Sequence, residues 1–251
     1  MEDFNALKLS LICIGLALFF IAERLFPYAP TRTIKHDVKN VSFAVISAIV
    51  SRFWIVPITG LSLYLNWGIT IHLPWYLEIP FYFILLDFWL YMWHRLMHQS
   101  KFLWRFHQVH HCDLSLDSTS ALRFHFMELA FSALFRGSLL IFIHIPLEIV
   151  FIYEGLVFFF AAFHHSNIKL VKPLEKPLSK FWITPSLHWM HHHAVRQDTN
   201  SNYGVTTTLW DKLFGTYNTR KRSTDMKQGI EGTAPQDFTF IELQLLPFKR
   251  K

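Results

Sequence analysis

The sequence predicts an all-α integral membrane protein, and three observations support that prediction. The 251 residues are 52% hydrophobic and 17% charged, whereas about a quarter of the residues in an ordinary soluble domain are charged. The mean hydropathy is positive, at +0.25. The apolar residues are also gathered into long blocks instead of being scattered, which is typical of helices that lie in a bilayer.

Five apolar segments follow one another along the chain. They are Leu9–Ala22, Val41–Leu65, Ile79–Trp93, Met127–Ile145 and Leu147–Phe163. Each of the last two is short for about 30 Å of hydrocarbon. We therefore expect them to form a tight or partly re-entrant helical hairpin, which gives about four transmembrane helices in all.

The predicted hairpin contains two charged residues at similar depth. Arg136 and Glu154 lie ten and eight residues from Pro146, at which the two segments meet. Charges at such a depth are costly unless they are matched. We therefore predict that the two side chains form an ion pair.

The basic residues predict the orientation. Lys and Arg are concentrated in residues 24–39, 94–125 and 166–251, while residues 66–78 carry none. The positive-inside rule places the basic stretches in the cytoplasm and the N-terminus outside. The first residues lack the features of a cleaved signal peptide, so we expect the first helix to be retained. This distribution of basic residues accounts for the net charge of +6 without a nucleic-acid partner. We expect the membrane to be a bacterial inner membrane rather than that of the endoplasmic reticulum.

Three histidine clusters lie at helical spacing in the cytoplasmic stretches. They are His94/His98, His107/His110/His111 and His188/His191/His192. Residues three or four apart share one helix face, and adjacent residues point about 100° apart. One member of each adjacent pair could therefore reach each of two metal ions.

Ligand number also predicts two ions, held in a cytoplasmic helical cap. Eight imidazoles exceed the four ligands of a zinc site and the five or six of a redox iron. His165, which follows the fifth apolar segment, is a ninth candidate ligand. Only Cys13 and Cys112 are present, which excludes thiolate-rich sites and a disulfide scaffold.

Other polar residues could be ligands or could hydrogen-bond to ligands. Asp87 shares a helix face with His94 and His98, so we expect it to accept the second ring N–H of a ligating histidine. The remaining candidates are His125, Glu128, Glu154 and Asn202. His193 is turned away from His188, while His36, His72 and His144 are isolated in the sequence, and we interpret these four as ordinary histidines.

Ligand type leaves the metal open, because imidazole binds Zn, Cu, Fe and Ni. The location narrows the chemistry. A site at the cytoplasmic end of membrane helices can receive a lipid, and attack on an unactivated C–H bond needs O2 and a redox metal. Hydrolysis would act on the headgroup instead. A zinc-binding membrane protein, a metal transporter and a zinc-dependent lipid hydrolase remain alternatives.

The motifs resemble those of the fatty acid hydroxylase/sterol desaturase superfamily. The similar segments are His94-Arg-Leu-Met-His98, Trp104-Arg-Phe-His-Gln-Val-His-His111, Arg123-Phe-His125, His165-Ser-Asn167, Leu187-His-Trp-Met-His-His192, Asn202-Tyr-Gly204 and Leu209-Trp-Asp-Lys-Leu-Phe-Gly-Thr-Tyr217. The resemblance covers residues 80–220 or so, within one expected membrane-embedded domain of residues 1–251. One departure is Phe126, which stands where many members have proline after the histidine.

This resemblance implies a di-iron oxidoreductase that uses O2 and two external electrons to hydroxylate or desaturate a lipid. Two iron ions are the implied cofactors, with zinc possible in the purified protein. The chain has no G-x-G-x-x-G nucleotide fingerprint. The implied electron donor is therefore a partner, such as a ferredoxin or a cytochrome b5-type protein.

Overall fold

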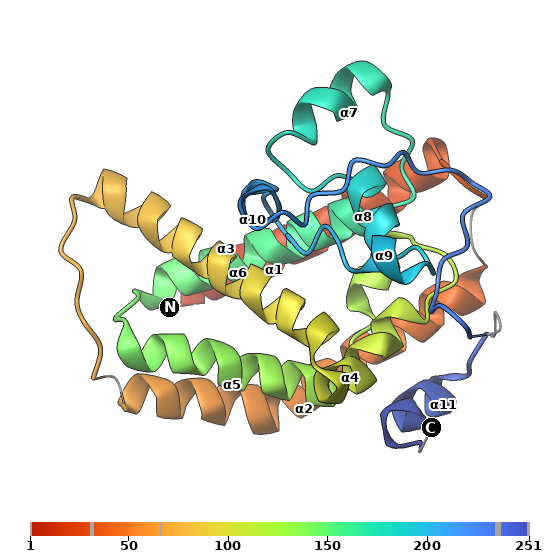
Figure 1. Cartoon of the computed structure of the whole chain (residues 1–251). Helices are drawn as coiled ribbons and strands as arrows, with labels where there is room; N and C mark the ends of the chain where they lie inside the picture. Colours follow the sequence, from red (N-terminus) through yellow and green to blue (C-terminus); the bar gives the residue numbers. More distant parts are fainter. Residues whose placement is uncertain (1, 31–32, 66, 234–236, 250–251) are drawn as a thin grey trace.

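The computed structural model describes residues 2–30, 33–65, 67–233 and 237–249, and within these ranges the fold is all helical apart from isolated bridges. The all-α prediction is confirmed. Five long helices correspond to the predicted apolar segments, although the segments Val41–Leu65 and Met127–Ile145 run one and three residues past the ends of their helices. Figure 1 shows the five helices. They are α1 (Glu2–Leu25), α2 (Ile34–Tyr64), α3 (Trp75–Gln99), α5 (Phe126–Phe142) and α6 (Leu147–His165).

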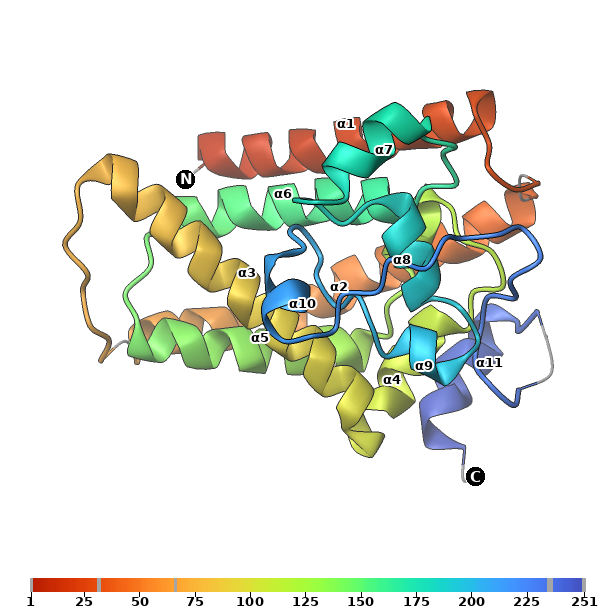
Figure 2. The ribbon, with the colours of Figure 1, turned by 45° about the horizontal axis from the view of Figure 1, so that its top comes forward.

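The long helices form two pairs with a third helix across them. Helix α1 packs along α6, and α2 packs along α5, while α3 contacts both α5 and α6. Figure 2 shows α3 crossing between the two pairs. A buried apolar cluster fills this crossing and includes Leu86 of α3, Leu140 of α5 and Val150 of α6.

The predicted tight hairpin is open. Helix α5 ends at Phe142, since Ile143 is extended, and α6 begins at Leu147 directly after Pro146. The chain between them pairs with the α2–α3 connection, where the Ile69 amide donates to the Phe142 carbonyl at 3.0 Å. Helix α5 is thereby held against α2 instead of folding back closely onto α6.

The predicted ion pair between α5 and α6 is confirmed. Arg136 Nη1 lies 2.6 Å from Glu154 Oε1, and both side chains are mostly shielded from solvent. The pair therefore bridges two helices whose main packing partners lie elsewhere.

Membrane crossing has narrower support than the sequence suggested. Among the described residues, only α6 is long and apolar enough by itself to span a bilayer. Helix α2 provides a second span if its two parts, Ile34–Val50 and Arg52–Tyr64, which are bent by 50°, are taken as one. The four-span topology and the cytoplasmic position of the cap remain predictions.

Short helices and loops gather at one end and along one side of the long helices (Figures 1 and 2). They are α4 (Lys101–His111), η1 (Ser118–Leu122), α7 (Lys172–Leu178), α8 (Pro185–His191), α9 (Arg196–Thr199), α10 (Leu209–Leu213), α11 (Phe240–Leu245) and η2 (Leu246–Phe248). Ser100 caps α4 by accepting from the Leu103 amide at 3.3 Å, and Pro185 opens α8 at a position that needs no N–H donor. Both α4 and α8 carry histidine clusters, so the start of each helix sets the positions of its imidazoles.

Candidate metal centre

Nine histidines from four helices meet in two groups. The first group is His94 and His98 of α3, His107 and His111 of α4, and His191 of α8. The second is His110 of α4, His165 of α6, His188 of α8, and His192 at the end of α8. In each group the candidate ligand atoms lie within 4.8 Å of one another. These nine are the histidines that the sequence analysis selected as metal ligands.

The adjacent histidines are divided between the groups. His110 and His111 face different groups, and so do His191 and His192. This follows from the rotation of about 100° per residue on a helix. Helices α4 and α8 therefore each serve both groups, which holds the groups side by side; the rings of His111 and His192 are stacked with centroids 4.3 Å apart.

The groups are shielded from water. None of the nine side chains is more than 7% exposed, and His111, His191 and His192 are 0% exposed. Burial lowers the pKa of His110, His111, His188 and His192, and neighbouring histidines lower it further. The same burial lowers the pKa of His191 to about 3. Burial therefore favours the neutral form of these five rings, which is the form in which imidazole binds a metal.

In the first group, two ring nitrogens meet that are both lone-pair acceptors. The Nδ1–H of His94 donates to the Tyr203 carbonyl at 2.7 Å, and the Nδ1–H of His107 donates to Glu128 Oε1 at 2.8 Å. In its neutral form each ring has one N–H, so both Nε2 atoms would then carry lone pairs. They nevertheless lie 3.2 Å apart. Two ligands at right angles on one ion, each about 2.1 Å away, are separated by roughly 3.0 Å.

The second group shows the same convergence. The Nδ1–H of His165 donates to the Ala161 carbonyl at 2.8 Å, which leaves a lone pair on its Nε2. That Nε2 lies 3.0 Å from His110 Nε2 and 2.9 Å from His188 Nε2. Among the described residues, both ring nitrogens of His98, His111 and His192 are buried without a hydrogen-bond partner. A bound cation in each group would account for these unpaired nitrogens, so the donor set fits a two-metal centre.

Backbone carbonyls and one carboxylate orient the rings. Besides Tyr203 and Ala161, the Ser201 carbonyl accepts from His191 Nδ1 at 2.8 Å. Glu128 is 3% exposed and is the carboxylate that holds His107. Glu128, which was predicted to be a ligand or to hydrogen-bond to one, thus contacts a histidine of the first group.

Asp87 does not hold a histidine, and that prediction is wrong. Its carboxylate accepts from Thr206, from Thr207 Oγ1 at 2.7 Å and from Trp210 Nε1 at 3.0 Å. The side chain points toward α10 and the loop before it, which together offer these three donors. Asp87 therefore anchors the cap to α3 instead of orienting a ligand.

The other candidates also have partners outside the two groups. His125 caps α5 by accepting from the Met127 amide at 3.1 Å, and its other nitrogen lies 3.2 Å from the Gln244 carbonyl. Glu154 pairs with Arg136. The Asn202 amide donates to the Leu187 carbonyl at 2.9 Å, directly before His188. Asn202 thus supports α8 without contacting a histidine of either group.

His36 is not isolated, contrary to the interpretation from sequence. Its Nε2 lies 2.8 Å from Asp113 Oδ1, and its Nδ1 lies 3.0 Å from Asp117 Oδ2. The two aspartates follow α4, so His36 joins α2 to the chain that leaves the metal groups. Sequence spacing gives no signal for this cluster, because His36 lies 77 or more residues from the two aspartates.

The residue that shapes the loop beside the first group was not predicted from the sequence. Asp211 accepts from the Tyr203 and Gly204 amides, each at 2.8 Å. The loop packs tightly around Gly204, where an added Cβ would lie 2.3 Å from the Thr207 carbonyl oxygen. Glycine is therefore required at position 204, and the loop holds the Tyr203 carbonyl against His94.

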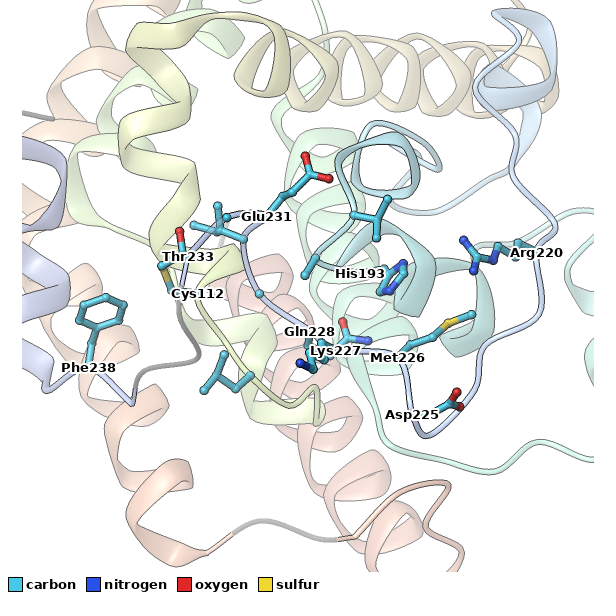
Figure 3. Close-up of a pocket in the computed structure, with 16 residues that line it drawn as sticks. Cys112, His193, Arg220, Asp225, Met226, Lys227, Gln228, Glu231, Thr233 and Phe238 are labelled. Carbon is cyan, nitrogen blue, oxygen red and sulfur yellow. The ribbon is translucent and has the colours of Figure 1, made fainter.

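Two cavities lie in the cap. One, of about 520 Å³, lies beside His193 and the buried Cys112 and is lined by charges of both signs: Arg220, Asp225, Lys227 and Glu231 (Figure 3). The other, of about 650 Å³, is lined by His98 and Trp104 and shares residues 229–231 with the first. Of the two, only the second is lined by a histidine of the metal groups.

Comparisons with known proteins give consistent matches. The family model described as fatty acid hydroxylase matches residues 79–216. The chain is 34% identical to the ornithine lipid hydroxylase OlsE of Rhizobium tropici, over 71% of this chain and 52% of that protein. It is 32% identical to human alkylglycerol monooxygenase, over 58% of this chain and 32% of the relative. The chain thus spans a third to a half of these relatives, and no solved structure gives a significant match.

Proposed function

The chain belongs to the fatty acid hydroxylase family, and we propose that it is a membrane-bound oxidoreductase that hydroxylates a C–H bond of a lipid with O2 at a di-iron centre. One observation carries the metal assignment: nine buried imidazoles converge in two groups with lone pairs facing one another. The matched relatives named as a lipid hydroxylase and a monooxygenase favour hydroxylation over desaturation.

In this proposal the protein binds, orients and shields the metals. His94, His98, His107, His111 and His191 hold one ion, and His110, His165, His188 and His192 hold the other. Two bound irons would supply the reduction of O2, with two external electrons, that puts one oxygen atom on the lipid carbon and releases the other as water. Glu128 and the Tyr203, Ser201 and Ala161 carbonyls hold four of the nine rings, those of His107, His94, His191 and His165, and would leave the Nε2 of each free for an ion.

The proposal also includes the route of the lipid, the position of the site in the membrane and the source of the electrons. The lipid enters from the bilayer, and the metal groups lie at the cytoplasmic ends of about four membrane helices, in a bacterial inner membrane. A ferredoxin or cytochrome b5-type protein delivers the electrons. An acidic carrier would be attracted by the positive net charge of the chain.

Metal content and O2 consumption test the proposal together. The protein is purified in neutral detergent, analysed for metals, and supplied with reductant, an electron carrier and total lipid extract. We expect about two irons per chain and lipid-dependent O2 uptake with a hydroxylated product. Zinc alone, with no O2 uptake from the iron-reconstituted protein with any carrier, would overturn the proposal in favour of zinc binding or metal transport.

A pair of variants locates the activity. His191→Ala removes a fully buried ring of the first group, and we expect it to abolish O2 uptake and to lower the iron content while leaving membrane insertion intact. His110→Ala should do the same through the second group. The matched control is His72→Ala, at an exposed position in the α2–α3 connection, which should keep both iron and activity.

A further inference from the structure

The cavity lined by His98 connects the cap surface to the first metal group. It is bounded by α4, by α9 and the chain just before it, and by the last residues of the described chain. His98 belongs to the five-histidine group, and the Trp104 ring packs 4.9 Å from it. A molecule bound here would therefore contact His98, one histidine of the first group.

The lining of this cavity is strongly cationic. Lys101, Arg105, Arg196 and Lys249 contribute four positive charges, and Glu231 is the single acid. Among the described residues, none of these four cations forms an ion pair. Cations left without protein partners in one concave place attract anions.

The chain fold gathers these cations instead of spreading them. Lys101 and Arg105 are four residues apart on α4 and so share one face. Arg196 begins α9, and Lys249 follows η2 at the far end of the sequence. The neighbouring cavity of Figure 3 has two basic and two acidic side chains, so the excess of positive charge is confined to the cavity that reaches the metal group.

The remaining lining suits a headgroup joined to an apolar chain. Gln99, Gln108, Thr199 and Asn200 offer amide and hydroxyl groups, while Trp104, Ile230 and Leu246 offer apolar surface. Guanidinium groups bind phosphate and carboxylate through paired, charge-assisted hydrogen bonds. Mixed polar and apolar surface beside the cations would accommodate the glycerol and the first carbons of a chain.

We propose that this cavity binds the anionic headgroup, a phosphate or a carboxylate, of the lipid that reacts at the metal centre. The inference rests on the proposed function and narrows the substrate class to lipids with an anionic head. Arg105 and Arg196 are positioning residues that hold the headgroup, and His98 marks the side of the cavity toward which the chain extends.

Direct binding tests the inference without turnover. The probes are dihexanoyl phosphatidic acid, dihexanoyl phosphatidylcholine, dihexanoylglycerol and inorganic phosphate, titrated calorimetrically into the full chain in neutral detergent. We expect phosphatidic acid to bind at least about tenfold more tightly than the phosphatidylcholine and the diacylglycerol, since each charge-assisted hydrogen bond lost weakens binding by about that factor. Inorganic phosphate should also bind more weakly, because it lacks the apolar part that would contact Trp104, Ile230 and Leu246. Arg105→Gln/Arg196→Gln should weaken phosphatidic acid binding at least about tenfold and raise its KM without changing kcat.

The matched control carries the same change of net charge away from the cavity. Lys172→Gln/Lys221→Gln alters two exposed lysines outside the cavity and should leave both affinity and KM at the level of the parent chain. An unchanged thermal midpoint in both double variants would show that folding is preserved.

Several outcomes would overturn the inference. Equal binding of the neutral and anionic lipids, or equal effects of the two double variants, would contradict the proposal that the cavity binds an anionic headgroup. If inorganic phosphate bound as tightly as phosphatidic acid, the cavity would be a site for free anions and not for a lipid headgroup. A raised KM for an acidic electron carrier with unchanged lipid binding would assign the cations to a protein partner. Failure of the proposed function is separate: it would appear as no O2 uptake with any lipid, whatever the binding data show.

Discussion

Replacing Glu128 by glutamine tests whether the buried carboxylate acts through His107 on a metal ion. Glu128 Oε1 accepts from His107 Nδ1 at 2.8 Å, and the carboxylate is 3% exposed. A hydrogen bond to a charged group contributes about 1.5–3 kcal/mol. Glutamine retains an acceptor oxygen and loses the charge, so about half of that contribution should remain. The loss of roughly 1.4 kcal/mol corresponds to about tenfold weaker metal binding.

The assay is removal of metal by a chelator, with the ions retained per chain measured at each concentration. Because Glu128 contacts a ring of the first group only, Glu128→Gln should release one ion at about tenfold lower chelator concentration and the other ion at the parent concentration. The control is Glu148→Gln, which removes the charge of an exposed residue on α6. Release of both ions at the parent concentrations, or of both ions earlier, would refute the assignment of His107 and Glu128 to one of two separate sites.

Four further substitutions, used in three experiments, test the packing of the loop, of the ion pair and of the cap. Gly204→Ala places a Cβ 2.3 Å from the Thr207 carbonyl oxygen, so it should destabilise the chain by about 1–3 kcal/mol in thermal unfolding; Gly60→Ala, which meets nothing within 4 Å, should not destabilise it. Arg136→Gln and Glu154→Gln should show a coupling energy of about 1 kcal/mol or more in a double-mutant cycle, and zero coupling would contradict the ion pair. Asp87→Asn should increase protease cleavage of residues 205–217 while the metal content stays at the parent level; loss of metal would restore the ligand-orienting role.

The sequence contained most of the local information about the centre. Helical spacing selected eight histidines, the end of an apolar segment added His165, and the 100° rotation between neighbours predicted that His110 and His111, like His191 and His192, could face different groups. The Arg136–Glu154 ion pair was also predictable, because depth along two apolar segments constrains which charges can meet. These successes share a cause: the geometry of a single helix follows from residue number alone.

Contacts between residues that lie far apart in the sequence did not follow from helical spacing. Asp87 lies on the face of α3 that carries His94 and His98, but the cap loop offers it two hydroxyls and an indole N–H, and these bind the carboxylate. His36 is isolated in the sequence and ion-paired in the fold, because the chain after α4 returns to α2.

The sequence by itself determined that the protein is helical, that its histidines could serve two ions, and which family motifs it carries. Only the tertiary structure decided which ring joins which group, which carboxylate holds a ring, and where four cations and a histidine share one cavity. The physical reason is the separation along the chain of the residues that interact. Periodicity fixes the direction of a side chain relative to its own helix, while the approach of α3, α4, α6 and α8 depends on packing between residues that lie far apart in the chain.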